Sequence, residues 1–297
     1  MFKTPLMIEQ HFHGAYGVDF STVSDPDKIV DLAKKLRTIG IGAFFPTLVT
    51  DSVENIKRQI KIIKDAAQKC SAILGIHLEG IFINPEKKGI HNPEHFLKLT
   101  PENYKLLEDD FIKIVTLAPE LDEGLIDYLL SRGVKIQAGH CVGGDLSKVS
   151  GATHTFNAMS GITHRGKSTA LSALINDNIY AEIIADGVHV SDDALKLFFK
   201  SKPADKVILI SDALPITYSD LKETIFAGSK IFYDGVKAAS ADGTIAGSTT
   251  MLDKIVKLLI TKNMFNPKFI ENTYTYHGIK PQGEIIWGDK GDIIQIS

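Results

Sequence analysis

The sequence is poor in cysteine, with only Cys70 and Cys141 among its 297 residues. Two cysteines cannot build the disulfide framework of a small secreted domain, and they cannot supply a cysteine-rich zinc site. Cys141 directly follows His140, a histidine at the end of a predicted strand. Neighbouring residues of a strand point to opposite faces, so we expect Cys141 to be a buried and unreactive thiol.

The sequence also lacks long apolar runs and an excess of charge. No run approaches the roughly 18–20 residues that cross a bilayer, and the first residues lack the apolar core and cleavage site of a signal peptide. The net charge is only −3, and no basic patch suggests nucleic acid or an anionic membrane as a partner. These features favour a cytoplasmic enzyme.

Two glycine-containing segments lack the ending of a phosphate-binding loop, and the serine-hydrolase motif is missing. Glycines occur in G-G-D at 143–145 and in A-G-S at 246–248, but neither segment ends in the G-K-[ST] of a phosphate-binding loop. There is no G-x-S-x-G elbow, which argues against a serine hydrolase. No internal repeat, low-complexity segment or linker divides the chain. The simplest interpretation is one domain over residues 1–297.

The sequence does contain short apolar runs that alternate with amphipathic stretches. The runs predict eight strands, at 5–11, 43–49, 72–78, 112–117, 134–139, 152–156, 181–185 and 207–210. The stretches predict helices at 26–39, 52–69, 123–132, 168–176 and 192–200. Eight strands alternating with helices predict an α/β fold, a closed (β/α)8 barrel of the TIM type.

The alternation weakens after residue 212. Residues 226–247 predict a hairpin, with turns at Tyr233–Gly235 and Ala241–Gly243. Residues 250–262 predict a helix with one apolar face. The tail, residues 283–297, predicts two short strands.

Chemically active side chains gather at the ends of the predicted strands. In such a barrel, catalytic groups lie at the carboxyl ends of the strands. Those ends carry His11, His13, His77, Glu79, His140, His154, Asp186, His189 and Asp212.

Histidine combined with carboxylate is a donor set for a divalent cation such as Zn²⁺. His11 and His13 are two positions apart, so their imidazoles point to the same side of the first strand, and we interpret both as metal ligands. Asp212, alone at the last strand, is well placed to accept a proton from water and return it to a leaving group. His77 shares a face with Glu79, and we expect it to hydrogen-bond near the site rather than bind the metal.

The ordered set of motifs from residue 5 to about residue 255 resembles a known family. The segments are H11-F-H13-G, H-L-E-G-x-F-x-N-P-x-K-K-G-x-H at 77–91, T-L-A-P-E at 116–120, H-x-F-N-A-M at 154–159, A-D-G-V-H at 185–189, S-D-A at 211–213 and G-T-I-A-G-S at 243–248. They are similar to those of the N-acetylglucosamine-6-phosphate deacetylase family in the amidohydrolase superfamily.

The resemblance implies roles for the catalytic residues. Glu79, His140 and His154 match the ligands of the metal common to all members. His11 and His13 match a pair that some members use for a second cation. Asp212 matches the general base and acid, and His91 matches the group that helps polarise the acetamide carbonyl. The resemblance thus implies one or two divalent cations; zinc is favoured, but imidazole and carboxylate also accept iron, cobalt and manganese.

The resemblance also implies substrate-binding residues, a reaction and a partner. The substrate-binding positions are Ile90, His91, Asn157, Ala158, Arg165, Asp186, His189, Ile245, Ala246 and Gly247. Arg165 matches an arginine that reaches the phosphate in the neighbouring subunit, which implies a homodimer. The implied reaction is hydrolysis of the acetamide of N-acetyl-D-glucosamine 6-phosphate to glucosamine 6-phosphate and acetate. The alternatives are an amidohydrolase acting on another N-acyl or cyclic amide, and a catalytically silent barrel that binds a sugar phosphate.

The chain departs from the family pattern at four places. Glu9 stands where an aspartate is usual, Ile81 replaces a proline, and G-K-S follows Arg165 where E-P-G is usual. Members carry roughly 50 residues before the barrel that help to form a small accessory β-sandwich. This chain begins about four residues before its first predicted strand, so we expect the sandwich to be absent or reduced to residues 283–297.

Overall fold

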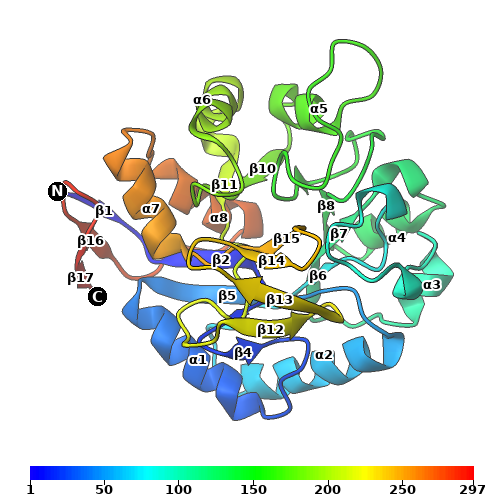
Figure 1. Cartoon of the computed structure of the whole chain (residues 1–297), viewed down its shortest axis with the longest axis horizontal. Helices are drawn as coiled ribbons and strands as arrows, with labels where there is room; N and C mark the ends of the chain where they lie inside the picture. The colour runs from blue at the N-terminus through cyan, green and yellow to red at the C-terminus, as the bar shows by residue number, and fades with distance from the viewer.

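The computed structural model describes all residues from 1 to 297. Its centre is a curled sheet of eight parallel strands, in the order β11-β10-β9-β8-β7-β6-β5-β2 (Figure 1). The strands are β2 (Met7–Phe12), β5 (Ile41–Leu48), β6 (Ile76–Glu79), β7 (Ile112–Leu117), β8 (Lys135–Ala138), β9 (Gly151–Ala152), β10 (Tyr180–Ile183) and β11 (Val207–Leu209). All eight predicted strands are therefore confirmed, in the predicted order.

The two ends of the sheet meet at its carboxyl edge. The backbone N–H of Asp212 donates to the carbonyl of His11 over 2.8 Å, and the N–H of His13 donates to the carbonyl of Ala213 over 2.8 Å. These bonds join the chain that follows β11 to the end of β2 and its continuation. They close the sheet into a barrel at the rim that carries the candidate site.

Eight α-helices accompany the strands: α1 (Pro26–Thr38), α2 (Val53–Ala67), α3 (Pro101–Lys105), α4 (Leu125–Ser131), α5 (Thr169–Ile175), α6 (Asp192–Ser201), α7 (Leu252–Thr261) and α8 (Lys268–His277). The predicted starts follow from capping side chains. Asp25 accepts a hydrogen bond from the second residue of α1, which opens with Pro26, and Ser52 accepts one from Asn55 of α2. None of the eight helices has the length and apolar character that a membrane span requires.

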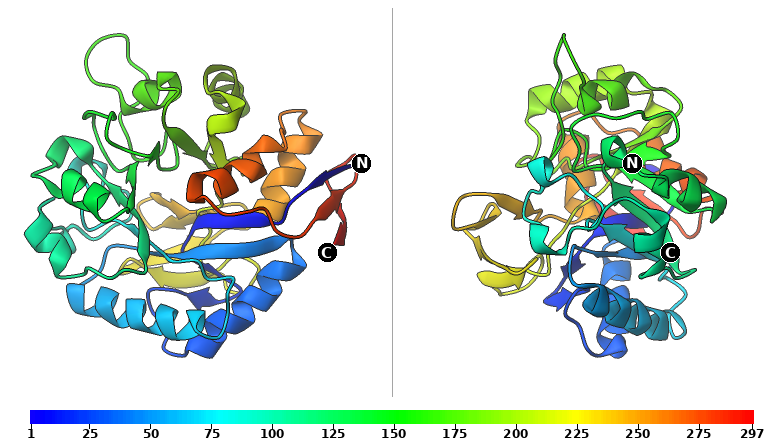
Figure 2. Two further views of the ribbon diagram at one scale, coloured as in Figure 1. Left: turned by 180° about the vertical axis from the view of Figure 1, so that it is seen from behind. Right: turned by 90° about the vertical axis from the view of Figure 1, so that its right-hand side faces the viewer.

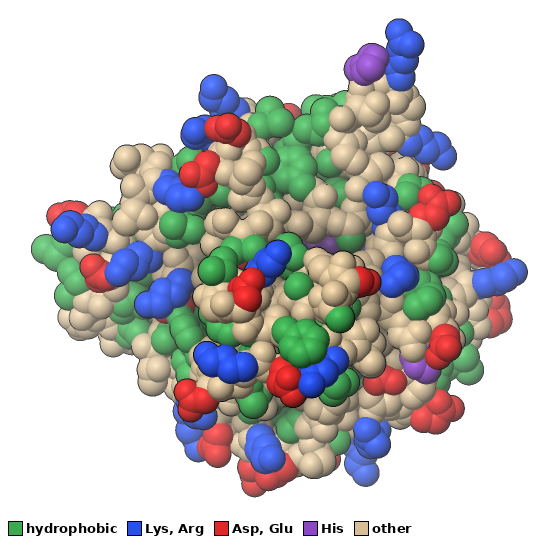
Figure 3. Space-filling view, in the orientation of Figure 1, with side chains coloured by type: hydrophobic (Ala, Val, Ile, Leu, Met, Phe, Trp, Pro, Cys, Tyr) green, Lys and Arg blue, Asp and Glu red, His purple; other side chains and the backbone are tan.

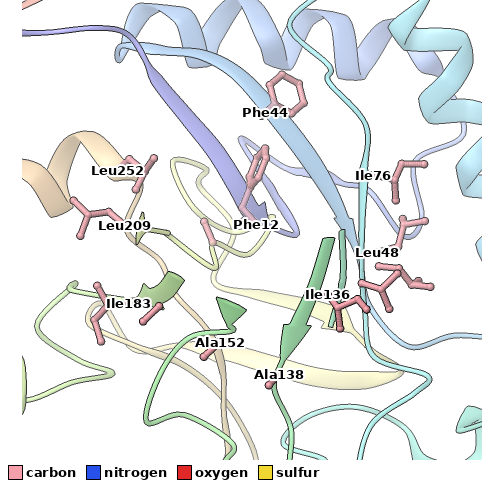
Figure 4. Close-up of a cluster of buried hydrophobic side chains, with 14 of the residues drawn as sticks. Phe12, Phe44, Leu48, Ile76, Ile136, Ala138, Ala152, Ile183, Leu209 and Leu252 are labelled. Carbon is pink, nitrogen blue, oxygen red and sulfur yellow. The ribbon is translucent and has the colours of Figure 1, made fainter. Parts of the chain in front are cut away.

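The main core lies between the barrel wall and the surrounding helices. It contains 62 buried hydrophobic residues. Figure 4 shows members of this layer on most of the barrel strands, from Phe12 of β2 to Leu209 of β11. Parallel strands that are buried on both faces read as near-continuous apolar runs, and the runs therefore predicted the strands well.

A four-stranded antiparallel sheet stands out from the barrel (Figure 2, right). It consists of β12 (Glu223–Phe226), β13 (Ser229–Tyr233), β14 (Ala238–Ser240) and β15 (Ile245–Gly247). The predicted hairpin is confirmed and extended by β12. Phe226 and Ile231 point into a small core shared with Leu214 and Ile216, which fixes this sheet against the barrel rim.

The chain ends form a third sheet, in which β16 (Ile285–Trp287) pairs with both β17 (Ile293–Ile296) and β1 (Phe2–Thr4) (Figure 1). The two predicted tail strands are confirmed, and the Trp287 indole donates to the Thr4 hydroxyl over 2.9 Å. A short β3–β4 ribbon, Gly14–Ala15 paired with Val18–Asp19, follows β2. That residues 283–297 are a remnant of an accessory sandwich stays a prediction.

Some elements differ from the prediction. Strand β9 ends at Ala152, whereas the prediction extended to Phe156, because the backbone turns at His154 (φ 30°) and Phe156 (φ 82°). Helix α8 was not predicted; its sequence is mostly polar or aromatic, although it contributes six buried residues.

Candidate metal centre and substrate pocket

The candidate ligands all lie at the carboxyl rim of the barrel. His11 and Glu79 end β2 and β6, and His13, His140, His154 and Asp212 follow β2, β8, β9 and β11 within a few residues. His140, His154 and Asp212 adopt positive φ angles of 48°, 30° and 52°. Such left-handed backbone is unfavourable for residues with a Cβ, and it concentrates at functional sites. Here the turns aim three side chains back over the barrel mouth.

Glu79 lies between two groups of histidines. Its Oε2 is 3.0 Å from Nε2 of His13 and 3.2 Å from Nε2 of His11. Its Oε1 is 2.9 Å from Nε2 of His154 and 3.4 Å from Nε2 of His140. One carboxylate therefore offers a different oxygen to each pair of imidazoles.

Asp212 joins the first pair. Its Oδ1 lies 3.3 Å from Nε2 of His13 and 3.5 Å from Nε2 of His11. The result is a four-residue group of His11, His13, Glu79 and Asp212, and a three-residue group of Glu79, His140 and His154. In each group the ligand atoms lie within 4.8 Å of one another, and all six residues are buried.

The arrangement of the donor atoms fits divalent cations. With metal–ligand bonds of about 2.1 Å, neighbouring donors of a tetrahedral site lie roughly 3.4 Å apart. Nε2 of His140 and His154 are 3.1 Å apart. His140 donates through Nδ1 to the carbonyl of Lys87 over 2.7 Å, so its Nε2 presents a lone pair to the group. Nε2 of His11 is buried and has no hydrogen-bond partner.

The electrostatics of the cluster favour added positive charge. Burial alone would raise the pKa of Glu79, but the surrounding imidazoles, His11 foremost, hold this pKa well below its usual range. Burial alone would lower the pKa of His13, yet the carboxylates of Asp212 and Glu79 raise it to about 9. Negative charge held in a buried site stabilises a cation placed there.

A cavity of about 330 Å³ opens above the cluster. Figure 3 shows a histidine at the bottom of a hollow in the face that carries the β12–β15 sheet. Predicted residues that line the cavity are His13, Glu79, Ile90, His91, His140, Asn157, Ala158, His154, His189, Asp212, Ile245, Ala246 and Gly247. Its size lies at the lower end of the range for small-molecule sites, roughly 300–1,000 Å³.

His91 presents a neutral imidazole to this cavity. Burial, reinforced by the nearby His140, lowers its pKa well below the ordinary value. Nδ1 of His91 lies 2.8 Å from the hydroxyl of Thr50, and its Nε2 is 3.9 Å from Glu79. When Nδ1 accepts from Thr50, the ring proton sits on Nε2 and can be donated to a substrate oxygen in the cavity.

Two predicted substrate residues do not line the cavity. Asp186 is buried beside it, 2.8 Å from Nδ1 of His189, and accepts from the Ser248 hydroxyl. It therefore orients His189 rather than facing the cavity. Arg165 is exposed in the loop that precedes α5 and projects from the barrel (Figure 1). The structure does not bring Arg165 to the cavity of its own chain.

Cys141 and His77 lie as the sequence predicted. Cys141 is fully buried, and burial raises the pKa of its thiol to about 12. His77 hydrogen-bonds to Thr116 over 2.8 Å and is absent from both ligand groups.

Sequence reasoning missed several residues around the site. Glu86, Lys87, Phe226 and Thr244 also line the cavity. Glu182 lies under the cluster, 3.2 Å from Nδ1 of His11. One signal was available for Glu182: it is an acidic residue inside the apolar segment I-Y-A-E-I-I-A at 179–185.

The fold resembles that of two enzymes of known structure. An enamidase, described as a member of the amidohydrolase superfamily, superposes with a TM-score of 0.53 at 13% identity, over 99% of this chain and 79% of the enamidase. A Mycobacterium smegmatis N-acetyl-D-glucosamine-6-phosphate deacetylase, in complex with N-acetyl-D-glucosamine 6-phosphate, superposes with a TM-score of 0.90 at 22% identity, covering 99% and 85% of the two chains. The fold is therefore that of the amidohydrolase class.

Sequence relatives narrow the class to a family. The chain is 33% identical to the N-acetylglucosamine-6-phosphate deacetylase of Bacillus subtilis, over 84% of this chain and 67% of the relative. It is 33% identical to that of Caenorhabditis elegans, over 71% of this chain, and spans 57% of the length of that relative. An N-acetylgalactosamine-6-phosphate deacetylase from Shewanella is 28% identical, over 86% of this chain and 68% of the relative. No protein-family model matches the chain. The chain belongs to the N-acetylglucosamine-6-phosphate deacetylase family.

Proposed function

We propose that the protein hydrolyses the acetamide of N-acetyl-D-glucosamine 6-phosphate, giving D-glucosamine 6-phosphate and acetate. The observation that carries the proposal is the position of Glu79 between two groups of imidazoles, with Asp212 beside one of them, at the floor of a small-molecule cavity. Relatives named for this activity and the smegmatis complex with this sugar phosphate support the choice of substrate.

The proposed cofactor is a divalent cation in each ligand group, with Glu79 contributing one oxygen to each. Zn²⁺ suits the nitrogen and oxygen donors best, and Fe²⁺, Co²⁺ and Mn²⁺ suit them as well. A bound cation would lower the pKa of a nearby water and polarise the substrate carbonyl.

The proton transfers fall to the chain's own residues. Asp212 accepts a proton from the attacking water and then delivers it to the departing nitrogen, because an amine leaves poorly unless it is protonated. His91 donates from Nε2 to the carbonyl oxygen as negative charge develops there. Phe226, Ile245 and Ala246 form an apolar part of the cavity lining.

The phosphate group is the remaining recognition problem. The cavity of one chain contains Asn157 and the backbone of Ala158, but not Arg165. We propose that Arg165 reaches the cavity of a second copy of this chain, so that the active form is a homodimer. Its exposure, its projecting loop and the absence of an ion-pair partner support this role.

Acetate release from N-acetyl-D-glucosamine 6-phosphate is the direct test. We expect turnover by the chain supplied with Zn²⁺, Fe²⁺ or Co²⁺, and loss of turnover after chelation because the carbonyl and water are no longer polarised. N-acetyl-D-galactosamine 6-phosphate should be tested in parallel, since the Shewanella relative is named as a deacetylase of that sugar phosphate. Release of acetate from neither sugar phosphate, with any of the three cations, would contradict the proposed function.

Arg165→Ala tests the phosphate contact. A charge-assisted contact to a phosphate is worth about 1.5–3 kcal/mol, so kcat/KM for the phosphorylated sugar should fall roughly 10- to 100-fold. The value for unphosphorylated N-acetylglucosamine should not change, because that substrate lacks the group that Arg165 binds. Steady-state kinetics on both sugars measure the difference. Lys167→Ala, in the same exposed loop, is the matched control, and an equal loss on both sugars would rule out phosphate recognition by Arg165.

A further inference from the structure

Under the metal-ligand cluster, the barrel interior contains a buried carboxylate without a Lys or Arg partner. Glu182, on β10, is 0% exposed, and its only ion-pair partner is His11. Its Oε1 accepts from the side-chain amides of Gln10 over 2.5 Å and Gln137 over 3.3 Å. Its Oε2 lies 3.2 Å from Nδ1 of His11 and accepts from the backbone N–H of His154 over 3.4 Å.

These contacts fix the position of the Glu182 side chain and direct its Oε2 toward His11. Gln10 and Gln137 come from β2 and β8 and both engage the same oxygen, which leaves the other oxygen for His11. A carboxylate can only accept hydrogen bonds, so the contact requires Nδ1 of His11 to carry the proton. The lone pair of the neutral ring is then on Nε2, which faces Glu79 and Asp212 at 3.2 and 3.5 Å.

The four histidine ligands differ in how their ring tautomers are set. Nδ1 of His140 donates to the backbone carbonyl of Lys87, in the three-residue group. Nδ1 of His11 donates to Glu182, in the four-residue group. Nδ1 of His13 and His154 is buried and has no partner. Each cation group therefore contains one histidine held by an acceptor, and Glu182 is the side chain that performs this task in the four-residue group.

We propose that Glu182 is a positioning residue that holds His11 with its Nε2 lone pair directed into the four-residue group, and thereby increases the affinity of that group for its cation. The proposal rests on the cation sites of the proposed function, but not on the identity of the substrate. Acceptors on the far nitrogen of a ligating imidazole orient the ring and increase its basicity, and their loss weakens metal binding 10- to 100-fold.

Zn²⁺ titration of the chelator-treated full chain, followed calorimetrically, tests the proposal. We expect two binding events in the unaltered chain. In Glu182→Gln, one event should weaken by about 10- to 100-fold, because the side-chain amide can also present an N–H to Nδ1 and allow the other tautomer, while the other event is unchanged. The ¹⁵N shifts of His11 should move from the Nδ1–H form in the unaltered chain to a mixture in the variant.

Gln137→Met is the matched control, because Gln137 contacts no histidine and Gln10 still holds the other oxygen of Glu182 over 2.5 Å. It disturbs the same buried layer, and both binding events should keep their affinities. If Glu182→Gln does not fold, Glu182→Asp retains the charge but shortens the reach to His11, and one event should still weaken.

Four results would overturn the proposal: two events of unaltered affinity in the Glu182 variants, an equal loss in Gln137→Met, an unchanged His11 tautomer, or a single event in the unaltered chain. Because the titration uses Zn²⁺ alone, a failure to release acetate from the sugar phosphate would not affect it.

Discussion

Replacing Asp212 by Asn should reduce kcat for acetate release by about 10²- to 10⁴-fold, the usual contribution of a positioned acid–base group. The amide keeps the size of the side chain and an oxygen near His11 and His13, but it cannot accept a proton from water or return it to the amine. KM should change little, because Asp212 contributes one of the many groups around the cavity. Steady-state kinetics at saturating cation measure both constants.

Asp253→Asn is the control for this substitution. Asp253 is half-buried, accepts from the hydroxyl of Tyr218 and does not line the cavity. Its replacement should leave kcat unchanged. If Asp212→Asn retained kcat near that of the unaltered chain, the proton shuttle would have to be assigned to another group.

Replacing Glu79 by Gln should weaken cation binding in both ligand groups. Glu79 gives one oxygen to the four-residue group and the other to the three-residue group. The amide has only one acceptor oxygen, and its NH2 group faces one of the two pairs of imidazoles. At least one cation group therefore loses a ligand and has an N–H donor in its place. We expect Zn²⁺ affinity to fall about 100-fold or more, and activity to fall to the level of the chelated chain.

Glu120→Gln is the matched control for Glu79. Glu120 follows β7 at the same rim and accepts from the N–H of Val142 and the amide of Asn84, but it contacts no imidazole. Metal content by atomic emission spectroscopy and acetate release should both match those of the unaltered chain. Full metal content in Glu79→Gln would show that the two groups do not depend on this carboxylate.

The sequence predicted the parts of the site that follow from strand order. Parallel strands bring their carboxyl ends to one rim, so His11, Glu79, His140, His154 and Asp212 could be placed together before any coordinates were known. Motif resemblance then supplied the substrate and the reaction. The apolar runs predicted the strands themselves, since strands buried on both faces consist mostly of consecutive apolar residues.

Other features depend on long-range packing that no local pattern contains. Glu182 looks like an isolated acid in an apolar strand, and only the curvature of the sheet places it under His11. The wall of the cavity at Phe226 and Thr244 depends on how the β12–β15 sheet packs against Leu214 and Ile216. Arg165 was expected from its motif to contact a substrate, but it lies in an exposed loop outside the cavity of its own chain.

The seam between the first and last strands of the barrel has a consequence for biosynthesis. The carboxylate of Glu9 accepts from the backbone N–H of Ser211, 202 positions further along the chain. At roughly 5–20 residues per second, the ribosome completes β2 well before β11 emerges. During that interval one edge of β2 has no partner, and exposed strand edges invite aggregation. The nascent chain therefore exposes this edge of β2 until β11, at Val207–Leu209, has been translated.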